Sequence, residues 1–209
     1  MGLFKRKKDT NIGIASFEKV SFEQFKEDWE KIYGTDLSDT NIIKLIYDKI
    51  RLPERSTKES AGYDFFAPFG FTLEKGSNIL IPTGIRAFMD HNALFSIYPR
   101  SGMGFKYRVM LANTVALIDA DYWKSDNEGH IMIKLCYEGI EPQCSIELLD
   151  IGNPENISFK TKRKENHEYK PLIISQGDKF VQGVFSTYGL VDDDCADGIR
   201  NGGTGSTGK

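Results

Sequence analysis

The chain has 209 residues, of which 40% are hydrophobic and 12% aromatic. This composition supports one folded domain with a small appendage and excludes a disordered or collagen-like chain. Its 27 Lys and Arg against 30 Asp and Glu give a formal net charge of −3, so the surface as a whole is not basic enough to predict binding to nucleic acid.

An amphipathic helix is predicted over residues 21–33. Its apolar residues recur at intervals of three or four, the spacing of one helical face. They are Phe22, Phe25, Trp29 and Ile32. Ser21 and Gln24 match a capping box, which places the start of the helix at Ser21.

A second helix is predicted over residues 38–50, and Pro53 closes it. Its expected apolar face consists of Ile42, Leu45, Ile46 and Ile50. We therefore expect residues 1–51 to form an N-terminal helical arm. This arm either packs on the main body or offers a docking surface to a protein partner.

After Pro53, short apolar runs separated by Gly, Pro and Asn predict β-strands. The runs are residues 79–81, 85–89, 94–98, 109–111, 131–137, 172–174 and 180–185. They predict an all-β sandwich or barrel over residues 52–191. A polar surface insertion is expected near residues 140–171, and its cations at positions 160 and 162–164 are either solvated or bind phosphate.

Residues 192–209 predict a glycine-rich tail that stays mobile until a ligand holds it. Residues 203–208 match GxGxxG, and residues 203–209 match most of a phosphate-binding P-loop pattern. Both motifs require a helix after the glycines, and none follows. The glycines still allow backbone amides to approach an anion closely, and Ser206 and Thr207 add hydroxyl donors. These residues therefore predict a flexible segment that covers a bound anion.

Residues 99–122 hold the densest set of candidate functional side chains. Arg100, Ser101 and Gly102 offer a guanidinium fork, a hydroxyl and a turn with exposed amides, which suit phosphate oxygens. Asp119 and Asp121 would share one face of an extended segment, so the spacing alone leaves a paired-carboxylate site open. A turn between them would separate the two side chains.

Five motifs, in order, resemble the trimeric dUTPase family in its Gram-positive bacterial and phage subgroup. They are AGYDFFAP at 61–68, PRSGMG at 99–104, NTVALIDADY at 113–122, GDKFVQGVF at 177–185 and RNGGTGSTG at 200–208. The resemblance implies a jelly-roll-like, all-β subunit and a homotrimer with sites between subunits. It also implies Mg²⁺-assisted hydrolysis of dUTP to dUMP and pyrophosphate by water attack on the α-phosphorus.

The resemblance assigns a role to each motif. Asp119 matches the water-activating carboxylate, Tyr122 the aromatic residue beneath the deoxyribose, and Asn113 the residue beside the pyrimidine. The expected phosphate contacts are Arg100, Ser101, Gly102 and Gln182, together with Arg200, Gly205, Ser206 and Thr207 of the closing tail. Asp64 matches a supporting carboxylate, and no direct protein ligand for Mg²⁺ is expected.

Some positions depart from the family pattern. Thr204 stands where an aromatic residue usually caps the uracil, which predicts weaker closure over the base. Arg108 and Ala116 replace frequent glycines. His130 is interpreted as an ordinary strand histidine. Two alternative functions stay open, a dCTP deaminase-like enzyme and a dUTP-gated regulatory binding protein of phage type.

The expected cellular location is the cytoplasm. Cys136, Cys144 and Cys195 form an odd count without CxxC spacing, which predicts reduced thiols. No apolar run approaches the roughly 20 residues of a membrane helix. Residues 1–8 also lack the apolar stretch of a signal peptide.

Overall fold

The structure, a computed structural model, describes residues 15–139, 145–148, 159–162, 170–200 and 202. The helices are α1 Phe22–Tyr33, η1 Thr35–Leu37, α2 Thr40–Asp48, α3 Ser101–Tyr107 and η2 Tyr122–Lys124. The first seven strands are β1 Ala15–Lys19, β2 Glu54–Arg55, β3 Tyr63–Phe66, β4 Phe71–Leu73, β5 Ser77–Pro82, β6 Ile85–Met89 and β7 Ala93–Pro99. The others are β8 Val109–Leu111, β9 Ala116–Asp119, β10 Met132–Tyr137, β11 Ser145–Leu148, β12 Phe159–Lys162, β13 Leu172–Ile174 and β14 Lys179–Thr187.

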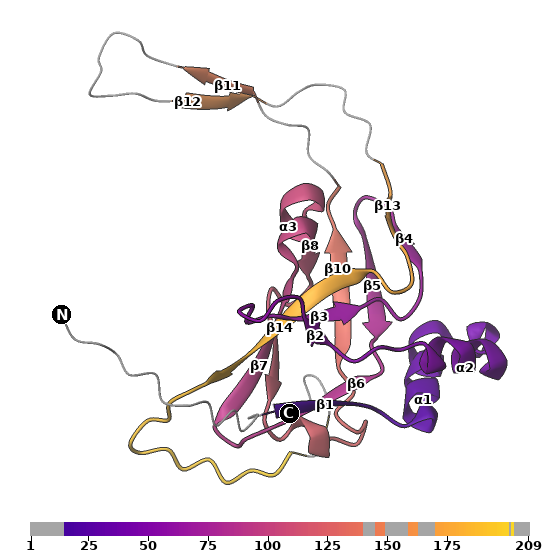
Figure 1. Cartoon of the computed structure of the whole chain (residues 1–209), viewed down its shortest axis with the longest axis vertical. Coiled ribbons are helices and arrows are strands. Elements are labelled where there is room, and N and C mark those ends of the chain that lie inside the picture. Colours follow the sequence, from indigo (N-terminus) through magenta and orange to yellow (C-terminus); the bar gives the residue numbers. More distant parts are fainter. Residues whose placement is uncertain (1–14, 140–144, 149–158, 163–169, 201, 203–209) are drawn as a thin grey trace.

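All strand pairs in this part of the chain are antiparallel, and the protein is mostly β. The largest sheet has the order β2-β3-β14-β7-β9, and a second sheet has the order β5-β10-β8. Three two-stranded sheets complete the set, β1-β6, β13-β4 and β11-β12. Figure 1 shows β14 crossing the middle of the molecule, with α1 and α2 together on one flank. Each apolar run that was predicted as a strand corresponds to a strand, which confirms the predicted series of short β-strands after Pro53.

The five-stranded sheet has one buried face and one face that carries polar groups. Phe95, Ile97 and Val181 point into the core and are fully buried. On the alternate positions, Asp64 lies opposite Gln182, Gln182 opposite Tyr98, and Asp119 opposite Leu94. Because side chains alternate across a strand, these positions share the other face of the sheet. That outer face also exposes two apolar side chains, Tyr98 and Leu117.

The first predicted helix is confirmed. Ser21 caps α1, and its Oγ accepts a hydrogen bond from Gln24 N at 3.1 Å. The reciprocal half of the capping box differs, because Gln24 Nε2 donates to Asp28 instead. The backbone N–H of Ser21 is satisfied by the Glu128 carboxylate at 2.8 Å, which lies far along the chain.

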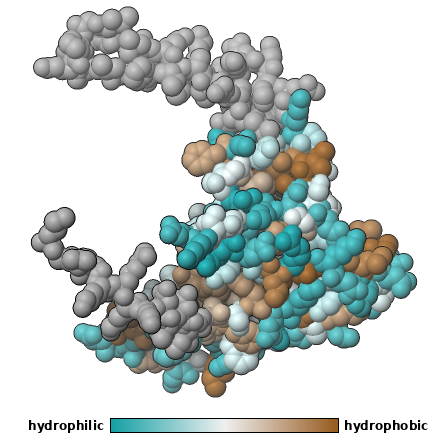
Figure 2. All heavy atoms as spheres, in the orientation of Figure 1, coloured by the Kyte–Doolittle hydropathy of each residue, from teal (hydrophilic) through white to brown (hydrophobic). Residues whose placement is uncertain are grey.

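The second helix is confirmed, but half of its predicted face is wrong, since Ile46 and Ile50 pack on the core whereas Ile42 and Leu45 do not. In α2, Ile43 is completely buried, whereas Ile42 and Leu45 are more than half exposed. The reason is that the helix begins at Thr40 after the Asp39 cap, and its contact with α1 selects the Ile43 side. The exposed pair contributes to an apolar area over α2 in Figure 2.

The N-terminal segment also contains a strand that the periodicity missed, since β1 pairs with β6 along its whole length. Phe25, Trp29, Ile43 and Ile50 belong to the same hydrophobic core as the sheets. The core therefore runs across the predicted boundary between residues 51 and 52. In the expected insertion, β11 and β12 pair with each other. Among the helices that the structure describes, none is long and apolar enough to span a membrane.

Candidate active site

The candidate catalytic carboxylate, Asp119, is the last residue of β9, and a turn at residues 120–121 leads into η2. This turn takes Asp121 off the strand, so the two carboxylates do not share a strand face. Both nevertheless bind one guanidinium: Arg200 Nε donates to Asp121 Oδ1 at 2.8 Å, and Arg200 Nη2 donates to Asp119 Oδ2. A pocket of about 550 Å³ opens beside these three residues.

Tyr122 lies directly below this ion cluster. Its ring is 5% exposed, and the Arg200 guanidinium sits 5.6 Å from the ring centroid, in cation–π range. The structure thus brings together three predicted site residues from two distant motifs, Asp119, Tyr122 and Arg200. The charged groups also act on the arginine. Burial opposes ionisation of Arg200, but the hydrogen bond that Arg200 donates to Asp121 and the two negative charges outweigh it and raise the guanidinium pKa.

Asn113 lies in the turn between β8 and β9 and lines a separate cavity of about 400 Å³ with Ala116 and Lys134. The strands on either side of this turn do not form a hairpin. β8 pairs with β10 and β9 with β7, so the turn joins two different sheets. Thr114 adopts a φ of 64°, a left-handed conformation that is rare for a β-branched residue.

Two of the predicted phosphate contacts, Arg100 and Gln182, lie at Asp64. Arg100 Nε lies 2.9 Å from Asp64 Oδ1, and Lys179 Nζ lies 3.0 Å from Oδ2. Ser56 Oγ donates to the same Oδ2 at 2.6 Å. Gln182 stands directly opposite Asp64 in the sheet, and Gly62 leaves room for it, since a Cβ there would lie 2.8 Å from Gln182 Oε1. The result is a buried carboxylate that holds two cations at the sheet surface.

The predicted turn after Arg100 is a helix. Arg100 is the N-cap of α3, and Ser101 and Gly102 are its first two residues. A run with two glycines carries little helix propensity, which explains why the sequence suggested a turn. The helix ends at Arg108 with a φ of 52°, so this replacement of the frequent glycine adopts a left-handed conformation.

Burial opposes ionisation of Asp64, but the Ser56 hydroxyl and the Lys179 and Arg100 charges outweigh it and hold its pKa below the ordinary value of 3.8. A carboxyl with a lowered folded-state pKa stabilises the fold above its ordinary pKa and loses that contribution as pH falls through the folded value. We therefore predict that Asp64→Asn lowers the free energy of unfolding by about 1 to 3 kcal/mol at pH 7.

Urea denaturation at pH 7 and at about pH 3 tests this prediction. The gap between the two proteins should begin to shrink once the pH falls below the ordinary Asp pKa of 3.8, because the wild-type protein loses this contribution progressively as pH falls toward the lowered folded-state pKa of Asp64. Asp36→Asn, at an exposed position, is the matched control. A gap of equal size at both pH values would contradict the charge-based account.

Several predicted residues fall outside the described residues. They are Gly205, Ser206 and Thr207 of the tail, Thr204, and Cys144. Cys136 and Cys195 are free thiols.

Lys179 was missed by the sequence analysis, although it lies inside one of the quoted motifs. In regular alternation Lys179 would share the core side with Val181, but the pairing of β14 with β3 shifts register between these two residues. Such a bulge re-aims a side chain, and here it turns the ammonium group to Asp64. A β-bulge has no clear signature in a single sequence, so the orientation of Lys179 could not be predicted.

The surroundings of His130 were not predicted either. This residue lies just before β10 and not within a strand, is fully buried and pairs with Asp28.

Comparison with known proteins gives consistent matches. A family model described as dUTPase matches residues 48–142. A deoxyuridine 5'-triphosphate nucleotidohydrolase from Lactococcus lactis is 32% identical over 162 residues, which cover 76% of this chain and 89% of the relative.

Two solved structures resemble the fold. The dUTPase of Streptococcus mutans superposes with a TM-score of 0.53 at 24% identity, over 85% of this chain and 98% of that one. The dUTPase of Staphylococcus bacteriophage 80alpha, solved with dUPNHPP, gives 0.53 at 20% identity, over 90% and 91% of the two chains.

Proposed function

The chain belongs to the dUTPase family, and on that premise we propose that it hydrolyses dUTP to dUMP and pyrophosphate. The observation that carries the proposal is the cluster at the end of β9. There a half-exposed Asp119 carboxylate lies beside the buried ring of Tyr122 and next to Arg200, the arginine of the C-terminal tail. This arrangement offers a base, a flat apolar surface and a cation in one place.

Asp119 acts as the general base in this mechanism. It takes a proton from a water molecule whose oxygen forms a bond to the α-phosphorus, while the bond from that phosphorus to the bridging oxygen breaks and pyrophosphate leaves. In the structure Arg200 pairs with Asp119. Substrate binding draws the guanidinium to the triphosphate and frees the carboxylate for the proton. Closure of residues 192–209 then excludes bulk water from the reaction.

Tyr122 provides the sugar selectivity. Its ring is held at 5% exposure, so the surface beneath the sugar does not yield easily to an extra atom. A 2′-hydroxyl would meet the ring, and UTP is excluded sterically. Asn113, at the rim of the 400 Å³ cavity, supplies the amide that pairs with the pyrimidine edge.

The two groups of site residues lie too far apart to serve one nucleotide within one subunit. Asp119 is opposite Leu94 in the sheet, and Arg100 follows the far end of the same strand β7. Six residues of strand correspond to about 20 Å, which exceeds the length of a triphosphate. This separation favours a site in which Asp119 and Arg100 come from two copies of the chain.

This separation supports a homotrimer in which the cluster around Asp64 and Arg100 of one subunit faces the Asp119 cluster of another. Tyr98 and Leu117, both exposed and apolar, lie on the outer face between the two clusters. They supply contact area for a second copy. We also infer that the sheets of residues 52–191 close into the jelly-roll-like barrel of the family, which the likeness to the Streptococcus mutans enzyme supports.

The family uses Mg²⁺, and the donor chemistry of this chain fits an ion held mainly by the triphosphate and water. Within the residues described, no group of three or more His, Cys, Asp or Glu side chains could hold a metal. Mg²⁺ keeps several waters and binds phosphate oxygens readily, and Asp119 and Asp121 are exposed enough to accept hydrogen bonds from such waters. When bound, the ion neutralises triphosphate charge.

Pyrophosphate release from dUTP, dCTP, dTTP and UTP, with Mg²⁺ present, tests the proposal. We expect turnover of dUTP and a kcat/KM for UTP lower by at least about 100-fold, since a rigid ring rejects the hydroxyl. Ammonia release from dCTP would indicate the deaminase-like alternative. Turnover of UTP comparable to that of dUTP would contradict the role of Tyr122.

A further inference from the structure

The segment that carries Tyr122 returns on itself, and residues 122–130 are called the Tyr122 loop below. Tyr122 Oη donates to the backbone oxygen of His130 at 3.1 Å. Gly129 has a φ of 72° and lies so close to the start of the loop that a Cβ there would be 2.4 Å from Trp123 Cα. The position of Tyr122 is therefore tied to the position of His130.

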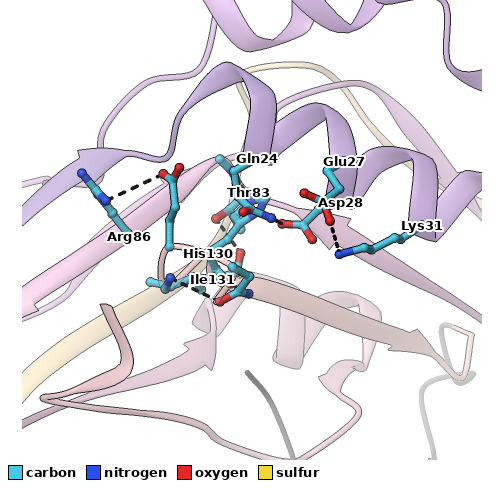
Figure 3. Close-up of polar contacts among 12 residues, drawn as sticks. Gln24, Glu27, Asp28, Lys31, Thr83, Arg86, His130 and Ile131 are labelled. Carbon is cyan, nitrogen blue, oxygen red and sulfur yellow. Dashed lines mark hydrogen bonds and ion pairs between the residues drawn. The ribbon is translucent and has the colours of Figure 1, made fainter. Parts of the chain in front are cut away.

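Helix α1 holds His130 from the opposite side, as Figure 3 shows. His130 Nε2 accepts a hydrogen bond from the backbone N–H of Gly84 at 2.7 Å. Nε2 must then carry the lone pair, so Nδ1 carries the proton and donates to Asp28 Oδ2, also at 2.7 Å. Gln24 Nε2 donates to the same carboxylate oxygen at 3.0 Å. Both imidazole nitrogens are thus fixed in a ring that is fully buried.

The N-terminal end of α1 makes a second attachment to the loop. The Glu128 carboxylate accepts hydrogen bonds from the backbone N–H and the hydroxyl of Ser21, at 2.8 and 2.7 Å. Glu128 holds a φ of 57° to do so. Left-handed backbone is unfavourable for a residue with a side chain and persists where surrounding contacts enforce it. The side chain of Glu128, and not the turn alone, therefore matters at this position.

Attachment of α1 to the body does not require these polar contacts. Phe25 and Trp29 already bury the helix in the core. A buried carboxylate and amide on the same face carry a desolvation cost, and such groups are weak sources of stability. Asp28 and Glu128 instead fix the position of α1 relative to the Tyr122 loop. Hydrogen bonds are directional, whereas apolar packing alone would allow the helix to slide along the loop.

We propose that Asp28 and His130 are positioning residues through which α1, with the Ser21–Glu128 contact, fixes the depth of the Tyr122 ring and hence the discrimination between deoxyribose and ribose. The inference rests on the proposed function. It assigns sugar specificity partly to an N-terminal helix that lies outside the five motifs. The same loop reaches the tail, since Ser125 Oγ donates to the Gly202 oxygen at 3.1 Å.

The test is the ratio of kcat/KM for dUTP to kcat/KM for UTP, with both substrates measured on one preparation. This ratio does not depend on the fraction of folded protein, so loss of stability alone leaves it unchanged. Asp28→Ala should lower the ratio about tenfold, through faster use of UTP, because the His130 ring loses its buried acceptor. Asp28→Asn keeps an acceptor oxygen and should lower it less, by about threefold.

Tyr33→Phe is the matched control. It removes another hydrogen bond of α1, from Tyr33 Oη to the Leu80 oxygen at 2.6 Å, without touching the Tyr122 loop. The ratio should stay at the wild-type value. A ratio unchanged in Asp28→Ala, or lowered equally in Tyr33→Phe, would overturn the proposal.

A second measurement separates this inference from the proposed function. Amide hydrogen exchange in residues 122–130 should become faster in Asp28→Ala and not in Tyr33→Phe, whatever the substrate of the protein. If the wild-type protein released no pyrophosphate from dUTP, the proposed function would fail. Unchanged exchange in the Tyr122 loop would then still refute the attachment to α1, and faster exchange would support it.

Discussion

Replacing Asp119 by asparagine is expected to lower kcat for dUTP by about 10² to 10⁴, the range that a positioned general base contributes. The asparagine side chain has nearly the same shape but no basic oxygen to take the proton from water. KM should change by no more than about threefold, because the groups that bind the nucleotide remain. Single-turnover pyrophosphate release and equilibrium binding of a non-hydrolysable dUTP analogue measure the two effects separately.

Asp121→Asn is the matched control, since Arg200 binds both carboxylates. Asp121 also contacts the tail arginine but lies beyond the strand, as the N-cap of η2. Its replacement should cost less than about tenfold in kcat, because Asp121 takes no proton in the proposed mechanism and Arg200 keeps Asp119 as a partner. A larger loss from Asp121→Asn than from Asp119→Asn would move the base to Asp121.

Local sequence patterns predicted helices α1 and α2 and seven of the fourteen strands in the described part of the chain. The short apolar runs predicted the strands, and the apolar periodicity and the Ser21 cap predicted α1. The structure confirms these elements. The failures are tertiary in origin. In α2 both Ile42 and Ile43 are apolar, and only packing against α1 decides that Ile43 is the buried one. Strand β1 alternates weakly and depends on its pairing with β6.

In the site, too, local motifs identified residues, whereas contacts between residues far apart in the chain could not be predicted. The motifs identified Asp119, Tyr122 and Arg200, and the structure brings these three together. Contacts between residues far apart in the chain left no local signal. Asp28 and His130 are separated by 102 positions, and each alone matches an ordinary helix or strand residue. Periodicity describes one element at a time, so it does not report which elements meet.

Mixing two inactive variants, Asp119→Asn and Arg100→Ala, is expected to restore activity if each site is shared between subunits. Arg100→Ala removes the guanidinium fork that neutralises phosphate charge, and about a 100-fold loss is expected from that change alone. Asp119 of β9 pairs with Leu94 near the start of β7, and Arg100 follows the end of that strand, so in the proposed trimer a single nucleotide meets Asp119 from one subunit and Arg100 from another.

The expected recovery follows from random exchange of subunits at equal amounts. A site is intact when its Asp119 comes from the Arg100→Ala protein and its Arg100 comes from the Asp119→Asn protein, which gives about one quarter of wild-type activity in a cyclic oligomer. Mixing Asp119→Asn with Asp119→Ala is the control and should recover nothing, because no subunit then carries the base. Native mass spectrometry confirms that exchange has occurred. If the subunits exchange and activity stays at the level of the separate variants, both residues do not serve one shared site, and the geometric argument for the oligomer fails.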